Sequence, residues 1–262
     1  MQAQNAYGFA VCVPLCNRHI IGKEGAALME HKLLQLQPRL QLLADLVPQG
    51  ARLADIGTDH GYLPVYLMQK GRITFAVASD VGQEPLQHAI RTAEEYGISN
   101  IDFRLCDGLK GIREDEVDTV VIAGMGGETI IHILAAAPWS KVPGRYTLLL
   151  QPMTKAGVLR HWLAENGYRF VEERLVWDKD FLYPVMIVTG GEQPKPDAIA
   201  EEYGVCLEND PLYGQYLDIQ IARLQRAVEG KRRSDKESVR EEAEQLNARC
   251  VELQRRRGEW HK

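Results

Sequence analysis

Between residues 50 and 190 the sequence alternates short apolar runs with longer segments of helical periodicity, and this alternation strongly limits the possible folds. Apolar runs of about four to eight residues bounded by turn residues are typical of buried strands. Strands separated by helical segments pair in parallel through right-handed crossovers. We predict strands at residues 51–57, 73–80, 100–108, 117–127, 146–152, 168–178 and 181–190, with helices at 62–71, 85–97, 128–137 and 155–167.

The last two predicted strands are joined by the short polar segment DKD, residues 178–180. This connection is too short to hold a crossover helix, so the two strands should pair antiparallel. The sequence therefore predicts an α/β fold with a doubly wound, Rossmann-like sheet of seven strands, the last of them antiparallel.

The composition changes after the Gly/Pro-containing stretch GGEQPKPD, residues 190–197. Two runs of apolar residues then follow at alternating spacings of four and three, which predicts an antiparallel coiled-coil hairpin. A helical pair packed on the main domain is the alternative. We place the main domain at residues 29–192, and the linker and helical appendage at 193–262. The seam positions are Leu217, Ile221, Leu224, Val228, Val239, Ala243, Leu246, Cys250 and Leu253.

Residues 1–28 lack sustained periodicity and do not form a clean signal peptide, because the basic residues follow the apolar patch. Met29 begins a segment, MEHKLLQLQPRLQLLADLVP, that is typical of a domain start. We therefore expect translation to begin at Met29 and residues 1–28 to be a non-native or disordered extension. An intact mass of the natively expressed protein that includes residues before Met29 would contradict this.

Charge and cysteine content narrow the class of protein. The formal net charge of −5 argues against a uniformly basic surface, although a local basic patch can still bind RNA. The five cysteines are scattered and form neither a disulfide framework nor a paired zinc motif, so we expect a reduced, cytoplasmic protein without a metal. No apolar run approaches the roughly 20 residues that span a bilayer, so no membrane partner is expected.

The turn after the first predicted strand reads DIGTDHG, residues 55–61. A dinucleotide fingerprint would need GxGxxG here, with a pyrophosphate seated on the following helix. This turn instead has GxxxG and two acids, which would repel a pyrophosphate but suit the amino group and sulfonium of S-adenosylmethionine. We therefore predict that Asp55, Gly57, Asp59 and Gly61 bind this cofactor.

The ends of the next three predicted strands agree with this assignment. Asp80 ends the second strand, where an acid accepts hydrogen bonds from ribose hydroxyls. Asp107 and Gly108 end the third strand, where they can hold the exocyclic amine of the donor's adenine. The fourth strand ends in AGMGG, whose small residues let a flat substrate lie beside the methyl group. The predicted cofactor-binding residues there are Gly124, Met125 and Gly126.

Five motifs together resemble the bacterial tRNA (adenine-22-N1)-methyltransferases: DIGTDHGYLP, the following SD, CDG, VVIAGMGG and LLLQP. The resemblance runs from about Met29 to the end of the chain. It implies a class I methyltransferase fold, S-adenosyl-L-methionine as donor, and N1-methyladenosine in the D-arm region of tRNA as product. One position departs from the family pattern, because Met153 stands where Asn often follows Gln-Pro. Gln151 and Pro152 match.

Four residues are our catalytic candidates. We expect His60 to hold the edge of the target adenine and Tyr62 to offer it a stacking face. Gln151 and Pro152, at the end of the fifth strand, are placed to contact the same base. The alternatives are a His60 that bonds only a backbone carbonyl, a core Tyr62 and a solvated Gln151. The remaining helical histidines, His88, His132 and His161, are interpreted as surface or packing residues.

Basic residues are the candidates for contact with tRNA, and phosphate contacts make binding salt-dependent. They are Lys32, Arg39, Arg232, Arg233, Arg255 and Arg256. We expect a monomer. Three other functions stay open: a methyltransferase with a small-molecule or protein acceptor, an RNA-binding protein with a vestigial donor pocket, and an NAD-dependent oxidoreductase. The missing GxGxxG disfavours the last of these.

Overall fold

The computed structural model describes residues 33–260, so the expectations for residues 1–28, Met29 and Lys32 lie outside the described part of the chain. The described residues form two compact units. Unit 1 holds residues 33–123 and 132–140, and unit 2 holds residues 124–131 and 141–260. The predicted boundary at residues 192 and 193 does not coincide with this division and stays a prediction.

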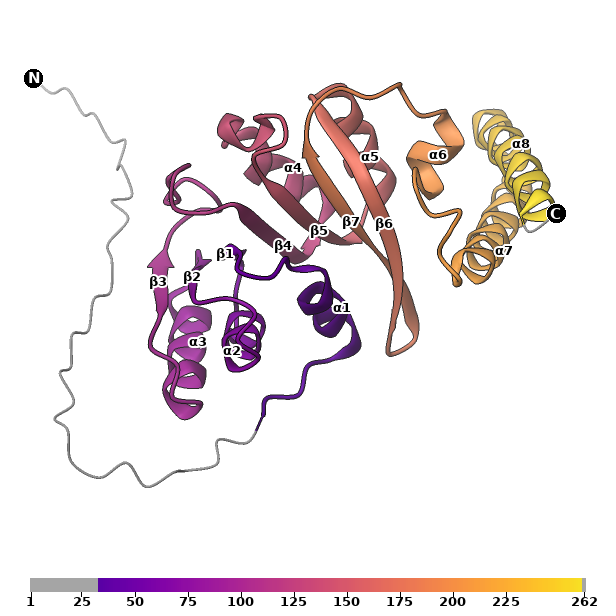
Figure 1. Ribbon diagram of the computed structural model, residues 1–262. Coiled ribbons are helices and arrows are strands. Elements are labelled where there is room, and N and C mark those ends of the chain that lie inside the picture. Colours follow the sequence, from indigo (N-terminus) through magenta and orange to yellow (C-terminus); the bar gives the residue numbers. More distant parts are fainter. Residues whose placement is uncertain (1–32, 261–262) are drawn as a thin grey trace, which may run out of the picture. The chain divides into compact units, whose positions relative to one another are not determined.

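All seven predicted strands are present and belong to one sheet in the order β3-β2-β1-β4-β5-β7-β6 (Figure 1). This confirms the predicted fold class. The strands are β1 Arg52–Ile56, β2 Phe75–Asp80, β3 Ile101–Leu105, β4 Thr119–Gly126, β5 Thr147–Thr154, β6 Tyr168–Asp178 and β7 Phe181–Gly190.

In unit 1, β1 pairs in parallel with β2 on one side and β4 on the other, and β2 pairs in parallel with β3. Parallel pairing brings the carboxyl ends of these strands to one edge, where α/β sheets bind ligands. The chain moves outward from β1 to β3, so right-handed crossovers place α2 and α3 on one face of the sheet. The helices are α1 Pro38–Leu46, α2 Tyr62–Gln69 and α3 Gln83–Glu95, and the short 3-10 helix Pro138–Lys141 begins in this unit.

In unit 2, β7 runs antiparallel to both β5 and β6, as the short loop predicted. Lys179 takes a left-handed φ of 54° in the turn between β6 and β7. Helix α4, Gly127–Ala135, begins in this unit, and α5, Ala156–Glu165, connects β5 to β6. Gly167 follows α5 with a φ of 79°, so it supplies the left-handed residue that ends a helix without strain.

The C-terminal residues of unit 2 form α6 Ala198–Tyr203, α7 Tyr213–Arg232 and α8 Glu237–Glu259. Helices α7 and α8 form the predicted hairpin, and every predicted seam residue is buried or half-buried. The short helix α6 was not expected from the sequence. It belongs to an apolar cluster with the sheet and both long helices, in which Leu175 of β6 joins Tyr203, Tyr216 and Leu253.

A buried ion pair also ties these helices to α5 and β6. Arg160 Nε donates to Glu173 Oε1 at 2.7 Å, and both side chains are fully buried. The second carboxylate oxygen of Glu173 accepts the backbone N–H groups of Val205 and Cys206, and Arg160 also donates to the carbonyl of Glu202. The base of the hairpin is therefore packed on α5 and β6, as the alternative prediction of a packed helical pair expected. Within residues 33–260, no helix is long and apolar enough to cross a membrane.

Candidate active site

The turn between β1 and α2 is built from left-handed residues. Gly57, Asp59 and Gly61 have φ values of 73°, 45° and 67°. The N–H groups of Gly57 and Thr58 both donate to the carbonyl of Ser79 on β2, and Gly61 N–H donates back to Thr58. Glycine accepts such angles at no steric cost, whereas a left-handed Asp59 is strained. Strain of this kind clusters at functional sites.

The close approach of this turn to α3 also requires a glycine at position 61. A Cβ atom at residue 61 would lie 3.0 Å from the Cβ of Ala89 and 3.1 Å from its Cα. The turn is therefore pressed against the middle of α3. This contact places the residues beside Gly61 next to the residues beside Ala89.

Asp55 is the buried acid of this turn, with only 7% of its surface exposed. Thr58 Oγ1 donates to Asp55 Oδ2 at 2.7 Å. Burial raises the pKa of Asp55 from 3.8 to about 6, the Thr58 hydrogen bond lowers it, and the charge of Asp80 raises it further. A nearby cation stabilises the ionised form of a carboxyl in such surroundings, which burial alone disfavours.

Asp80 ends β2 as the sequence predicted, whereas β3 already ends at Leu105, so Asp107 and Gly108 lie in the turn after it. Asp80 is half-buried, and its Oδ1 accepts the N–H of Gly82 at 2.7 Å, immediately before α3. Asp107 is exposed and pairs with Lys110 at 2.5 Å. Gly108 has a φ of 56°, and a Cβ there would lie 2.9 Å from the side chain of Ile133. Glycine at 108 therefore lets this turn pack closely beside α4.

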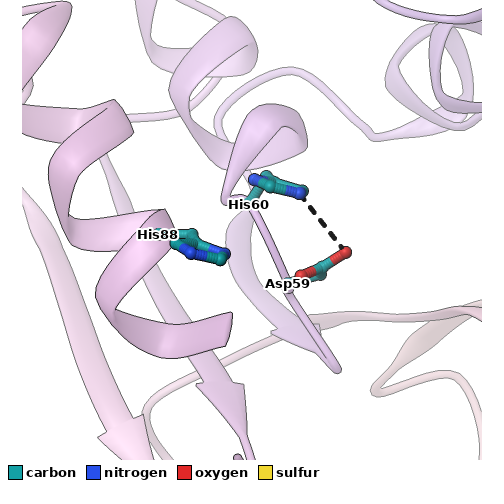
Figure 2. Close-up of side chains that lie close together, drawn as sticks. All are labelled: Asp59, His60 and His88. Carbon is teal, nitrogen blue, oxygen red and sulfur yellow. Dashed lines mark ion pairs between the residues drawn. The ribbon is translucent and has the colours of Figure 1, made fainter. Parts of the chain in front are cut away.

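Asp59, His60, Tyr62 and His88 form one side-chain cluster, which we call the ring cluster. Figure 2 shows His88 extending from α3 toward Asp59 and His60 of the turn, with Asp59 Oδ2 and His60 Nε2 3.7 Å apart. The His60 ring is parallel to the Tyr62 ring, with centroids 5.0 Å apart, and to the His88 ring, with centroids 5.1 Å apart. Tyr62 is 38% exposed, which excludes a core position for it. The sequence analysis interpreted His88 as a surface or packing residue and did not place it beside His60.

The same cluster can be considered as a metal site, because Asp59, His60 and His88 offer ligand atoms within 4.8 Å of one another. An imidazole nitrogen binds a metal along its lone pair, which lies in the plane of the ring. The planes of His60 and His88 are stacked at 6° to each other, so their lone pairs lie in separate parallel planes. The rings would have to leave the stack to share one ion. The described geometry is that of a stacked aromatic surface.

In unit 2, the predicted residues at the ends of β4 and β5 contact one another. Gln151 is fully buried, and its Oε1 accepts the N–H of Gly124 at 3.0 Å. Its Nε2 donates to the carbonyl of Pro152. A Cβ on Gly126 would lie 3.3 Å from Thr154 Oγ1, so the two strand ends are closely packed there. The amide of Gln151 therefore fixes the backbone of the AGMGG segment.

Pro152 is buried, while Met153 beside it is 38% exposed. Lys155 follows β5 with a left-handed φ of 56°, and its ammonium pairs with Glu128 at 2.6 Å. The structure thus groups the predicted residues of unit 1 on the β1 turn with Asp80 nearby, and groups those of unit 2 around Gln151. Asp107 pairs with Lys110, which the sequence analysis did not single out.

Some basic residues of the C-terminal hairpin are paired with acids. Arg232 pairs with Glu244, Arg256 with Asp197, and Arg255 with both Glu252 and Glu259. The exposed Arg223 and Arg233 make no ion pair within the described part of the chain. The hairpin therefore presents a mixed surface rather than a uniformly basic one.

Comparisons with known proteins identify the family of this chain. A family model described as a methyltransferase domain matches residues 36–186. The tRNA (adenine(22)-N(1))-methyltransferase of Bacillus subtilis (strain 168) is 37% identical over 185 residues, or 70% of this chain and 75% of the relative. A Streptococcus pneumoniae protein assigned as a tRNA (m1A22) methyltransferase, solved in complex with S-adenosyl-L-methionine, matches with a TM-score of 0.71 at 31% identity over 82% of this chain and 97% of that chain. The structure of M. capricolum TrmK in complex with S-adenosyl-homocysteine has a TM-score of 0.72 at 25% identity, covering 87% of this chain and 99% of that chain.

Proposed function

Because this chain belongs to the tRNA (adenine(22)-N(1))-methyltransferase family, we propose that it transfers a methyl group from S-adenosyl-L-methionine to N1 of adenine 22 in tRNA. The bound donor supplies an electrophilic methyl carbon on a sulfonium. The N1 lone pair forms the new carbon–nitrogen bond as the carbon–sulfur bond breaks. The products are S-adenosylhomocysteine and a cationic N1-methyladenosine.

Buried Asp55 is the observation that carries the donor assignment. Its carboxyl lies in a turn with a second acid, Asp59, and the negative charge of Asp80 raises its pKa. A pyrophosphate would add negative charge to this acidic site, whereas an ammonium and a sulfonium would offset it. The residues therefore fit S-adenosylmethionine. Asp55 and Asp59 hold its cationic end, with Gly57 and Gly61 keeping the backbone close. Asp80 accepts from the ribose hydroxyls, and Asp107 and Gly108 hold the adenine amine.

The acceptor site needs no strong base, since N1 of neutral adenine already carries a lone pair. Its task is to present the base in line with the methyl–sulfur bond, and such positioning supplies on the order of 7–11 kcal/mol of a barrier. N1 lies on the Watson–Crick edge, so the adenine must leave its stack and enter a pocket. The exposed ring of Tyr62 offers the flipped base a stacking face, and His60 holds its edge. The exposed carboxylate of Asp59 offsets the charge that develops on the product.

In this proposal, Gln151 acts by holding the backbone of the neighbouring strand end. Its Oε1 is engaged by the Gly124 N–H and its Nε2 by the Pro152 carbonyl, so it holds the backbone of the AGMGG segment in place. Pro152 is buried and supports the same segment from the end of β5. A direct hydrogen bond from the adenine amine to Gln151 Oε1 stays a prediction, and this oxygen would then accept a second donor beside the Gly124 N–H.

The C-terminal hairpin contacts the body of the tRNA. Arg223 and Arg233 are exposed and available for phosphate, while the arginines in ion pairs must exchange carboxylate for phosphate. Such exchange keeps the binding electrostatic and therefore salt-dependent. The tRNA substrate and the cysteine pattern support a cytoplasmic activity. A monomer suffices, since the hairpin seam is filled from within one chain.

The test is methyl transfer from labelled S-adenosylmethionine to unmodified bacterial tRNA, followed by nucleoside mass spectrometry of the product. The expected product is N1-methyladenosine that disappears when adenine 22 is replaced by another base. Donor binding without RNA methylation would refute the tRNA assignment. It would favour the second candidate, a class I methyltransferase with a small-molecule or protein acceptor.

A further inference from the structure

His88 is the member of the ring cluster that the proposed mechanism does not use. It belongs to α3, 28 residues after His60, and it is only partly buried. Its ring is parallel to that of His60 within 6°, as the ring of Tyr62 is within 8°. His60 is therefore oriented by rings from two different helices.

The backbone explains why this contact forms. Gly61 approaches Ala89 so closely that a side chain at residue 61 would overlap it. The neighbours of these two residues in the chain are His60 and His88. The same close approach that fixes the turn on α3 thus brings the two imidazoles together, so their stacking does not depend on flexible side chains alone.

Apart from the two stacked rings, the contact that His60 makes with Asp59 is weak. Asp59 Oδ2 is 3.7 Å from His60 Nε2, and these two side chains are 65% and 44% exposed. A surface ion pair of this kind contributes about 0–1 kcal/mol, which is too little to fix a ring. A stacked aromatic pair contributes about 0.5–1.5 kcal/mol and also sets the direction of the ring plane. The stacks on Tyr62 and His88 are therefore stronger constraints on His60 than the Asp59 contact is, and His88 supplies the one that comes from α3.

We propose that His88 is a positioning residue of the acceptor site, which stacks on His60 and pre-orders the aromatic surface that receives the target adenine. This inference rests on the proposed function. His88 acts through the face of its ring, so its nitrogen atoms are not required. A phenylalanine at position 88 keeps the stacking surface and removes any metal ligand or proton carrier, whereas an alanine removes the stack.

The experiment compares His88→Ala and His88→Phe with the wild type, and uses His132→Ala on the exposed face of α4 as a matched control. Calorimetric donor affinity reports that each variant is folded with its donor site intact. Methyl transfer is then measured over a range of tRNA concentrations, with EDTA present. We expect His88→Ala to lower kcat about 3- to 10-fold with donor affinity unchanged, since about 0.5–1.5 kcal/mol of stacking is lost. His88→Phe should stay within about twofold of the wild type, and His132→Ala should match it.

A spectroscopic readout checks the stack itself. The His60 ring protons should carry a ring-current shift that His88→Ala changes more than His88→Phe does. An unchanged kcat in His88→Ala would overturn the proposal, and so would a loss in His88→Phe as large as that in His88→Ala. Activity that EDTA abolishes and Zn²⁺ restores would overturn it in favour of a metal site. Absence of RNA methylation by the wild type would instead refute the proposed function, on which this inference rests.

Discussion

Replacing Asp55 by asparagine should make the protein more stable while weakening donor binding. The folded chain keeps a proton on Asp55 up to about pH 6, because burial raises its pKa from 3.8. The unfolded chain loses that proton near the ordinary value. The folded state therefore binds more protons within this window, and stability falls as pH rises from about 4 to about 6. Above about pH 6, the stability lost through ionised Asp55 no longer changes with pH.

The shift in pKa sets an upper bound on the effect. At 1.36 kcal/mol per pKa unit, ionised Asp55 costs the folded chain up to about 3 kcal/mol. Asparagine has no proton to lose and keeps an oxygen that accepts from Thr58, so Asp55→Asn should recover about 1–3 kcal/mol at pH 7.5. The same change removes a charge-assisted hydrogen bond to the donor, worth about 1.5–3 kcal/mol, so the affinity should fall about 10- to 100-fold.

Urea unfolding of the donor-free protein between pH 4 and pH 8 measures this effect as a difference between variant and wild type. Other carboxyls with lowered pKa values, such as Glu116 and Asp197, change stability in the opposite direction but equally in both proteins. Asp235→Asn, an exposed position between α7 and α8, is the matched control. A stability difference that does not grow from pH 4 to pH 6, or an Asp55→Asn protein less stable at pH 7.5, would refute the reasoning.

The remaining predictions concern the buried pair, the buried amide and the RNA. Glu173→Gln should lower the free energy of unfolding by about 3–5 kcal/mol, because it leaves Arg160 charged and buried. Glu172→Gln, in a surface pair, should lower it by less than about 1 kcal/mol. Equal losses for the two variants in urea unfolding would contradict this. Gln151→Ala should lower kcat about 10-fold or more in steady-state assays, since the Gly124 N–H loses its acceptor at about 1–3 kcal/mol. Affinity for tRNA should fall steeply with salt in filter binding while donor affinity changes little, and a flat dependence for tRNA would rule out the phosphate contacts.

The fold was predictable because it depends on periodicity within short windows. The strand runs, the short loop before β7 and the seam of the hairpin are all local patterns, and the structure confirms each of them. The turn after β1 was recognisable for the same reason, since its glycines and acids are adjacent in sequence. The resemblance added the acceptor, which no local pattern specifies.

Contacts between distant segments were not predictable in this way. His88 has the spacing of a helix-surface residue, and only the packing of Gly61 on Ala89 brings it to His60. Gln151 has the sequence context of a solvated strand end, but the neighbouring strand end covers it. Neither residue carries a sequence signal for its partner, because each partner lies more than 25 residues away.

The Arg160–Glu173 pair limits how this protein can be divided or recombined. A chain ending after β7 would keep both charges but lose the backbone donors of Val205 and Cys206, and Leu175 would lose the apolar cover of Tyr203 and Leu253. The helical hairpin is therefore not an independent module that can be exchanged between related enzymes at a linker. Any exchange has to carry the α5–β6 surface with it, and substitutions at the two sides of this junction should arise together.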